Sequence, residues 1–352
     1  MPRIREHGQQ RVSQESWMNQ VFMAAPVSSF PMRSRLLAVA GVLLLAASGA
    51  QAQTWPAQTV SIVVPYPPGS APDVLARGLA ERLGGATDKT VVVENKPGAN
   101  AIVGSDAVAK AAATGNTLLL VDRLTLSVNP VLYARLPYAA RDLTGVSDVA
   151  SVDLAVVCRA DAPFKTWGEM IDHARKHPGA LMVATGGQGS VHHLSLELIE
   201  RHYGVQITDV PYKGMVPAAA AVVGGDVPCV VTGPETVLEH IRSGRLRGLV
   251  VGNARRSPLM PDVPTLAEAG APGDLLIPTH FTLFAPAKTP PQVIRGINAA
   301  VARAQADPGF VSTFAARGLV IAPSTPEQVN AGVEAETARL GKLIRDANIR
   351  LE

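Results

Sequence analysis

The sequence predicts an α/β protein with two similar lobes, and three observations lead to this fold class. Short apolar runs alternate with helical segments along the chain, a pattern typical of mostly parallel sheets flanked by helices. The 352 residues are enough for two domains with sizeable cores, because 47% of them are apolar. One loop design occurs twice: a strand, a turn with glycine, a serine at the start of a helix, and the helix. The repeated design predicts two lobes that face each other.

The first 52 residues have the composition of an export leader. A short basic segment at 32–35 precedes an apolar stretch at 36–48, and Ala50-Gln51-Ala52 is a small-residue cleavage site. We therefore expect a signal peptide with cleavage after Ala52, and a periplasmic mature protein. An uncleaved membrane anchor is the alternative, although the apolar stretch is short for a membrane span. Translation could also begin at Met32 rather than at Met1.

The charge of the chain argues against a polyanionic partner. The formal net charge is +3, but five of the 32 basic and two of the 29 acidic residues lie in the leader, which leaves 27 of each. A neutral mature chain is not typical of proteins that bind nucleic acid or a charged membrane surface. We therefore expect no nucleic-acid partner.

The chain has two cysteines, Cys158 and Cys229, and both lie in apolar runs that resemble strands. An export compartment permits a disulfide bond. Buried free thiols are equally compatible with these positions, so the sequence leaves the pairing open.

The first loop, residues 67–73, follows a buried strand expected at 61–64. It is a turn of prolines and a glycine, and a helix is expected at 74–83. Ser70 with Asp73 three residues later has the form of a capping box, which places the helix start at Ser70. A helix start presents unpaired N–H groups and the positive end of the helix dipole, a site for an anion such as a carboxylate. An ordinary turn is the alternative.

The next segments continue the alternation and end in polar side chains. Strands are expected at 90–94, 117–121 and 152–158, with helices at 103–112 and 166–176. Ligands of such sheets gather at the carboxyl ends of the strands. Arg123 lies at the exit of one strand, where its guanidinium can grip a ligand carboxylate or pair instead with Asp122 or Asp148.

The second loop, residues 185–190, follows a strand at 181–185 and contains three glycines, which let the backbone approach a ligand closely. Ser190 is placed to cap a helix at 191–203. Lys213 at the next strand end can pair with an anion or be an ordinary surface lysine. The remaining expected strands are 207–212, 226–232, 246–251 and 281–285. One further helix is expected to end at 223, and the others are expected at 235–243, 290–306, 310–317 and 326–346.

Metal binding and catalysis have little support. His192 and His193 are adjacent on a helix and point about 100° apart, which makes a poor metal pair. A hydrolase would use Ser190 and His193, but the nucleophile elbow requires glycines where this chain has Gln188 and His192. The glycine-rich turn also lacks the lysine of a P-loop and the spacing of a dinucleotide site. We expect no catalytic residue, no metal and no cofactor.

A series of short segments resembles the extracytoplasmic substrate-binding receptors of tripartite tricarboxylate transporters, the Bug family. The segments span essentially the whole mature chain in the family's order. They are Val64-Pro65-Tyr66-Pro67-Pro68-Gly69, Val93-Glu94-Asn95-Lys96-Pro97-Gly98-Ala99, Asn129-Pro130-Val131-Leu132-Tyr133, Gly187-Gln188-Gly189-Ser190 with His193, Val210-Pro211-Tyr212-Lys213-Gly214, Arg256-Ser257-Pro258, Pro261-Asp262-Val263-Pro264-Thr265 with Glu268-Ala269-Gly270, and Phe284-Ala285-Pro286.

The resemblance implies a periplasmic binding protein of the two-lobed Venus-flytrap kind (type II-like). Its lobes would be residues 53–152 with 282–352, and residues 153–281. It would capture a small organic carboxylate between the lobes and deliver it to the permease subunits of a membrane transporter, and we expect a monomer. The alternative role is a ligand sensor for a two-component system.

The resemblance also implies which residues bind the ligand. In the family the two loops clamp one ligand carboxylate, partly through ordered waters. The expected binding residues lie on the two loops and at neighbouring strand ends: Pro67, Gly69, Ser70, Asp73, Arg123, Thr125, Thr185, Gly187, Gly189, Ser190, His193, Lys213 and His280.

The chain departs from the family's pattern at several of these places. Ser70 replaces a second glycine of the first loop, and Pro72 lacks an N–H group. Asp122-Arg123-Leu124 stands where the family has a small hydroxylic loop, and residues 231–233 and 280–282 also differ. No relative's ligand is therefore transferred to this chain.

Overall fold

The structure is a computed structural model that describes residue 55, residues 59–346 and residues 348–351. The leader expected at 1–52, its cleavage site after Ala52 and the choice between Met1 and Met32 lie outside the described residues. Residues 53–352 group into one unit. Within the described part of this unit, no helix has the length and apolarity that a membrane crossing requires.

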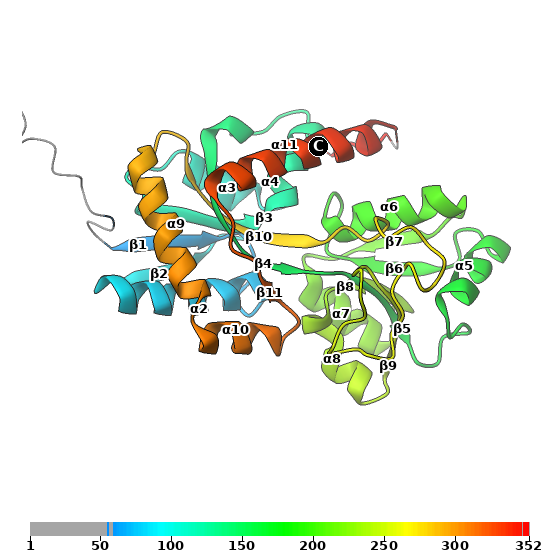
Figure 1. The fold of residues 1–352 in the computed structure, drawn as a ribbon. Coiled ribbons are helices and arrows are strands. Elements are labelled where there is room, and N and C mark those ends of the chain that lie inside the picture. Colours follow the sequence, from blue (N-terminus) through cyan, green and yellow to red (C-terminus); the bar gives the residue numbers. More distant parts are fainter. Residues whose placement is uncertain (1–54, 56–58, 347, 352) are drawn as a thin grey trace, which may run out of the picture. The chain divides into compact units, whose positions relative to one another are not determined.

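A six-stranded sheet takes strands from both ends of the chain, in the order β11-β4-β10-β3-β1-β2 (Figure 1). The strands are β1 (Val60–Val64), β2 (Val91–Asn95), β3 (Thr117–Asp122), β4 (Leu143–Val152), β10 (Thr279–Pro286) and β11 (Val320–Ile321). β1 pairs in parallel with β2 and β3, and β10 runs antiparallel to β3 and β4. The start of β10 therefore lies beside the carboxyl end of β3. Phe281 pairs there with Asp122, and His280 immediately precedes Phe281.

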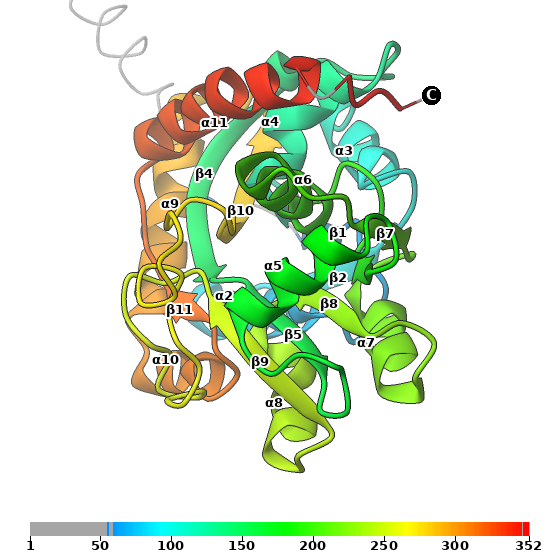
Figure 2. The ribbon, with the colours of Figure 1, turned by 90° about the vertical axis from the view of Figure 1, so that its right-hand side faces the viewer.

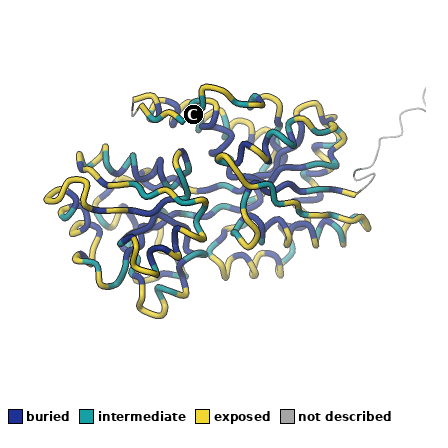
Figure 3. Tube along the Cα trace, turned by 180° about the vertical axis from the view of Figure 1, so that it is seen from behind, coloured by how far each residue is buried: buried dark blue, intermediate teal, exposed yellow. Residues whose placement is uncertain are grey.

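Helices cover both faces of this sheet because successive strand residues are apolar on both sides. Ile62 and Val64 belong to the core beneath one set of helices, and Val63 belongs to the core beneath the other. The first set is α2 (Ala71–Thr87), α9 (Pro291–Gln305) and α10 (Pro308–Ala315), and the second is α3 (Ile102–Ala109), α4 (Arg123–Leu132) and α11 (Pro326–Asp346). Figure 3 shows the strands as continuous buried runs between partly exposed helices.

A five-stranded sheet has the order β7-β6-β8-β5-β9. Its strands are β5 (Ala155–Arg159), β6 (Met182–Thr185), β7 (Thr208–Pro211), β8 (Cys229–Thr232) and β9 (Leu246–Val251), and its helices are α5 (Trp167–Lys176), α6 (Val191–Tyr203), α7 (Met215–Gly224) and α8 (Pro234–Arg242). β6 pairs in parallel with β7 and β8, so their carboxyl ends share one edge. The sheet becomes antiparallel at β5 and β9.

A disulfide bond joins Cys158 of β5 to Cys229 of β8. The two residues are directly opposed in the antiparallel ladder and belong to the apolar core of this sheet. The pairing that the sequence left open is therefore made in the structure.

The chain passes between the two sheets twice (Figure 1), and Figure 2 gives the view from the side of the five-stranded sheet. The first passage is the short link between β4 and β5, and the second lies between β9 and β10. The inward side chains of α4 and the later part of α11 join the core of the five-stranded sheet, among them Leu132 and Leu340. The two sheets therefore share buried apolar contacts.

Three elements differ from the sequence-based expectation. The strand expected at 152–158 corresponds to β5, whereas β4 and β11 were not expected. The polar exit after β3 is the start of α4, because Asp122 caps it by accepting a hydrogen bond from the Leu124 N–H (3.1 Å). Pro130 lies inside this helix, in its last turn.

Candidate ligand-binding site

The first loop joins β1 to α2 and turns at Gly69. The Ser70 N–H donates to the Pro67 carbonyl (3.3 Å), and Gly69 has φ = +81°, a conformation that favours glycine. Ser70 is the N-cap of α2, as the sequence predicted, but the capping box was wrong. The Ser70 hydroxyl donates to the Pro67 carbonyl (2.7 Å) and not to the helix, because the short turn brings this carbonyl within its reach.

The buried side chain of Asp73 supports the first loop through hydrogen bonds. Its carboxylate is 2% exposed and accepts hydrogen bonds from the Gly69 N–H (2.9 Å) and the Asn95 amide (2.8 Å). Arg77 adds a bidentate contact at 2.9 and 3.1 Å. Burial alone would raise the pKa of Asp73, but these donors outweigh it and the pKa lies below its usual value. Asp73 is therefore a fixed anion that shapes the loop.

The second loop joins β6 to α6 and repeats the geometry of the first. The Ser190 N–H donates to the Gly187 carbonyl (3.1 Å), as Ser70 does to Pro67, and Gly189 has φ = +75°. Ser190 is the N-cap of α6, and its hydroxyl accepts the His193 N–H (3.3 Å), as the sequence predicted. Gly187 also needs to be glycine, because a Cβ there would lie 3.1 Å from the Tyr212 carbonyl oxygen.

His193 occupies the place in the second loop that Asp73 has in the first. It is 8% exposed, and its Nδ1 accepts a hydrogen bond from the Gly189 N–H (3.3 Å). Its Nε2 lies 3.8 Å from the Glu197 carboxylate and 3.9 Å from that of Asp209. Asp209 also accepts the Thr185 hydroxyl (2.6 Å). Burial raises the pKa of Asp209, and the Thr185 hydroxyl and His193 oppose this rise.

The second loop lies against elements of the six-stranded sheet. A Cβ built on Gly189 would be 2.7 Å from a methyl carbon of Leu132, 3.0 Å from one of Leu351 and 3.4 Å from the Asn100 amide nitrogen. Asn100 is itself held by an amide contact of 2.9 Å with Asn129. The structure therefore brings the second loop next to α4 and to the loop after β2.

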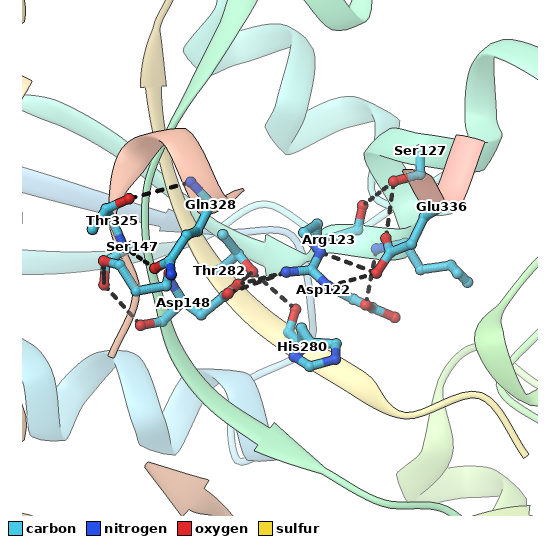
Figure 4. A network of polar contacts seen from close by, with 12 residues as sticks. Asp122, Arg123, Ser127, Ser147, Asp148, His280, Thr282, Thr325, Gln328 and Glu336 are labelled. Atoms are coloured by element: carbon cyan, nitrogen blue, oxygen red, sulfur yellow. Dashed lines mark hydrogen bonds and ion pairs between the residues drawn. The ribbon is translucent and has the colours of Figure 1, made fainter. Parts of the chain in front are cut away.

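Arg123 belongs to a buried network of ion pairs (Figure 4). Its guanidinium contacts Asp148 of β4 at 3.1 Å and Glu336 of α11 at 2.6 Å, and it is 11% exposed. Ser127 and Thr282 complete the network by donating to Glu336 and Asp148. Of the two roles that the sequence left open, the structure favours pairing, although its partners include Glu336, which sequence reasoning missed because it lies 213 residues away.

Asp122, at the end of β3, and His280, at the start of β10, flank this network. Burial and the nearby Glu336 raise the pKa of Asp122 to about 7, although the Leu124 N–H and Arg123 oppose the rise. Burial and the positive Arg123 lower the pKa of His280. The pKa of Asp122 therefore lies near neutral pH, in contrast to the lowered pKa of Asp73.

The other predicted residues lie apart from the network. Thr125 is buried on α4 beside Tyr66, and Lys213 is exposed at the end of β7. A cavity of about 530 Å³ is lined by residues 130–134, at and just after the end of α4, and by residues near the chain end, including Arg345 and Leu351. None of the predicted ligand-binding residues lines this cavity.

Among the described residues, no group of three histidine, cysteine or acidic side chains could hold a metal ion. A hydrolase would need the His193 ring to take the Ser190 proton. Its Nδ1 instead accepts the Gly189 N–H, and its Nε2 faces two carboxylates. This arrangement has the form of a structural support beneath a loop.

The family model of the tripartite tricarboxylate transporter family receptor matches residues 73–349. The chain therefore belongs to this receptor family. It is 36% identical over 324 residues to the protein BugT of Bordetella pertussis. The matched segment covers 91% of this chain and 99% of BugT. The resemblance to the Bug family is thereby confirmed.

Solved structures of related receptors have the same fold. A Rhodopseudomonas palustris protein with adipate is 30% identical (TM-score 0.78) and covers 84% of this chain and 99% of its own. MatC from Rhodopseudomonas palustris with bound malate is 29% identical (TM-score 0.76) and covers 82% and 100%. The protein is thus a two-lobed solute-binding receptor and not an enzyme.

Proposed function

We propose that this receptor binds a small organic carboxylate between its first and second loops. The lobes would be residues 53–152 with 282–352, and residues 153–281. The observation that carries the proposal is the matched geometry of the two loops, each of which ends at the start of a helix. Related receptors with adipate or malate bound support this class of ligand.

Each loop offers two backbone donors to an anion. The first N–H groups of a helix have no partner within the helix. In α2 these are the N–H groups of Ala71 and Asp73, since Pro72 has none and the Ser70 side chain makes no cap bond. In α6 they are the N–H groups of Val191 and His192, because the N–H of His193 is already bonded to Ser190. Two helix dipoles add to the attraction for a carboxylate.

The two cap serines are expected to contribute unequally. The Ser70 hydroxyl already donates its proton to Pro67, whereas the Ser190 hydroxyl only accepts and keeps its proton available. Ser190 is therefore the side-chain donor to the ligand. Thr125, Lys213 and His280 remain predicted ligand contacts, with His280 at the far end of the ligand, and Arg123 is proposed to tie α4 to β4 and α11 through its ion pairs instead.

Replacing Ser190 with tyrosine tests this site. The bulky ring would occupy the place of the ligand carboxylate, so we expect malate or adipate binding to be lost in isothermal titration calorimetry. The exposed Ser312→Tyr on α10 is the control and should bind as the wild type does. Unchanged affinity in Ser190→Tyr, at an unchanged melting temperature, would remove the second loop from the site.

We further propose that the receptor is exported by its signal peptide, acts as a monomer and delivers its ligand to the permease of a tripartite transporter. Removal of its gene should abolish uptake of the bound carboxylate even when the permease is expressed independently. Intact uptake would favour the sensor role. Intact-mass measurement of the periplasmic protein, with a chain beginning at Gln53, checks the cleavage after Ala52.

A further inference from the structure

One side-chain nitrogen atom helps to hold the shape of the second loop. Within the part of the chain that the structure describes, the His193 ring is the side chain that accepts the Gly189 N–H, at Nδ1. Gly189 also lies against Leu132, Leu351 and Asn100. A change at this hydrogen bond would therefore alter the approach of the loop to the six-stranded sheet.

The hydrogen bond defines the protonation of the ring. Because Nδ1 is an acceptor, its lone pair is free of a proton, and the proton of the neutral ring is on Nε2. There it faces the carboxylates of Glu197, on the same helix, and Asp209, on β7. A second proton has only Nδ1 to bind to, where it would point at the Gly189 N–H and break the bond.

Acidic side chains face the ring. The carboxylates of Glu197 and Asp209 lie 3.8 and 3.9 Å from Nε2, and the half-buried Glu200 interacts with the same two carboxylates. These acids also neutralise the added charge, so the imidazolium brings little extra attraction for an anionic ligand. Histidine side chains exchange a proton between pH 5 and 8, within the range of extracytoplasmic conditions.

We propose that His193 is a positioning residue whose unprotonated Nδ1 holds the second loop in its ligand-binding shape, so that protonation of this nitrogen weakens binding. The proposal rests on the proposed function for its effect on affinity, but not for its effect on the loop. The first loop does not share this dependence, because the carboxylate that holds Gly69 there has a lowered pKa and stays charged between pH 5.5 and 8.

Two substitutions at His193 test separately the hydrogen-bond acceptor of its side chain and the proton that this side chain can gain. His193→Asn keeps an acceptor, since the Asn side-chain oxygen is the same number of bonds from the backbone as Nδ1, and it does not titrate. His193→Leu removes the acceptor. The exposed His202, on the same helix, provides matched controls as His202→Asn and His202→Leu.

The loop itself can be observed without any ligand. Gln188-Gly189 is the only Gln-Gly pair in the sequence, so carbonyl-¹³C glutamine with ¹⁵N glycine labels the Gly189 amide alone in a carbonyl-correlated spectrum. We expect this amide resonance to shift between pH 8 and 5.5 in the wild type and to stay nearly constant in His193→Asn. Burial lowers the pKa of His192 to about 4, so the neighbouring ring stays neutral over this range.

The binding measurement uses malate and adipate on the same proteins. At pH 8 we expect His193→Asn to bind within about threefold of the wild type, and His193→Leu to bind about three- to tenfold more weakly, the effect of one lost hydrogen bond. At pH 5.5 the wild type should lose several-fold in affinity relative to His193→Asn. This ratio cancels the titration of the ligand and of Glu200, whose pKa burial raises to about 7.

The outcomes distinguish the two proposals. A Gly189 resonance that is constant in the wild type, or that shifts equally in His193→Asn, overturns the role of His193, as does an affinity ratio that does not change with pH. If the resonance shifts as expected but no carboxylate binds at any pH, the positioning role stands and the carboxylate-receptor function fails.

Discussion

The two loops are built on one plan but are held by different chemistry. In each, a serine N-cap follows a glycine with positive φ, and the side chain three residues after the serine accepts the N–H of that glycine. In the first loop this side chain is Asp73, an anion fixed by Arg77 and Asn95. In the second it is His193, which accepts only while Nδ1 is unprotonated. The comparison teaches that loops of equal shape can differ in their response to pH.

The sheets beneath the loops also differ. We expect this difference to have the largest effect on the free energy of unfolding. Only the sheet beneath the second loop contains cysteines, and the bond between Cys158 and Cys229 closes a segment of 71 residues. Loop-closure entropy predicts a loss of about 4 kcal/mol of unfolding free energy in Cys158→Ala with Cys229→Ala. Urea unfolding measures the loss, and reduced wild-type protein is the control.

Hydrogen exchange sharpens this prediction, because it reports on each sheet separately. We expect amides of β5 and β8 to lose protection in the double variant, while those of β1 and β2 keep theirs. Equal loss in both sheets would show that the two sheets unfold as one unit, and the disulfide would then not distinguish the loops.

The next effect is smaller and concerns the anchor of the first loop. Asp73→Ala leaves the Gly69 N–H and the Asn95 amide without their acceptor, and we expect a loss of about 2 kcal/mol, since Arg77 remains partly hydrated. Asp73→Asn should lose less because it retains an acceptor oxygen. Chemical unfolding at pH 7 measures both losses, and a Asp73→Ala protein as stable as the wild type would contradict the anchoring role.

The pH dependence of this anchor follows from its lowered pKa. A carboxyl group with a folded pKa below its unfolded value adds stability above the unfolded pKa, about 4, and this stability disappears as the pH falls through the folded pKa. The difference between the wild type and Asp73→Asn should thus be constant from pH 8 to 5.5 and shrink only in stronger acid. A decline between pH 8 and 5.5 would remove the contrast with His193.

The sequence could predict the loops because their signals are local. Gly69, Ser70, Gly189 and Ser190 stand at positions where turn geometry and helix capping depend on neighbouring residues, and the alternation of strands and helices predicted both sheets. The capping box failed for a local reason too, since the Pro67 carbonyl competes for the Ser70 hydroxyl.

The supports of the loops could not be predicted because they are distant in the sequence. Asn95 reaches Asp73 across 22 residues, and Glu336 reaches Arg123 across 213. Such contacts depend on the order of strands in a sheet, which one sequence does not specify. The placement of His193 beneath its loop was missed for a different reason: the motif shows the residue but not which nitrogen is used.

The smallest expected effect is a difference in ligand affinity between alanine substitutions at the two glycines. Gly69 and Gly189 have nearly the same φ, so alanine should cost about 1 kcal/mol of backbone strain in either loop. A Cβ on Gly69 meets no atom within 4 Å, whereas one on Gly189 presses on Leu132 and Leu351. We therefore expect Gly189→Ala to weaken malate or adipate binding severalfold more than Gly69→Ala, at similar losses of melting temperature. Equal affinities would mean that the second loop can retreat from α4 and still bind, and the contact between the sheets would then play no part in holding the ligand.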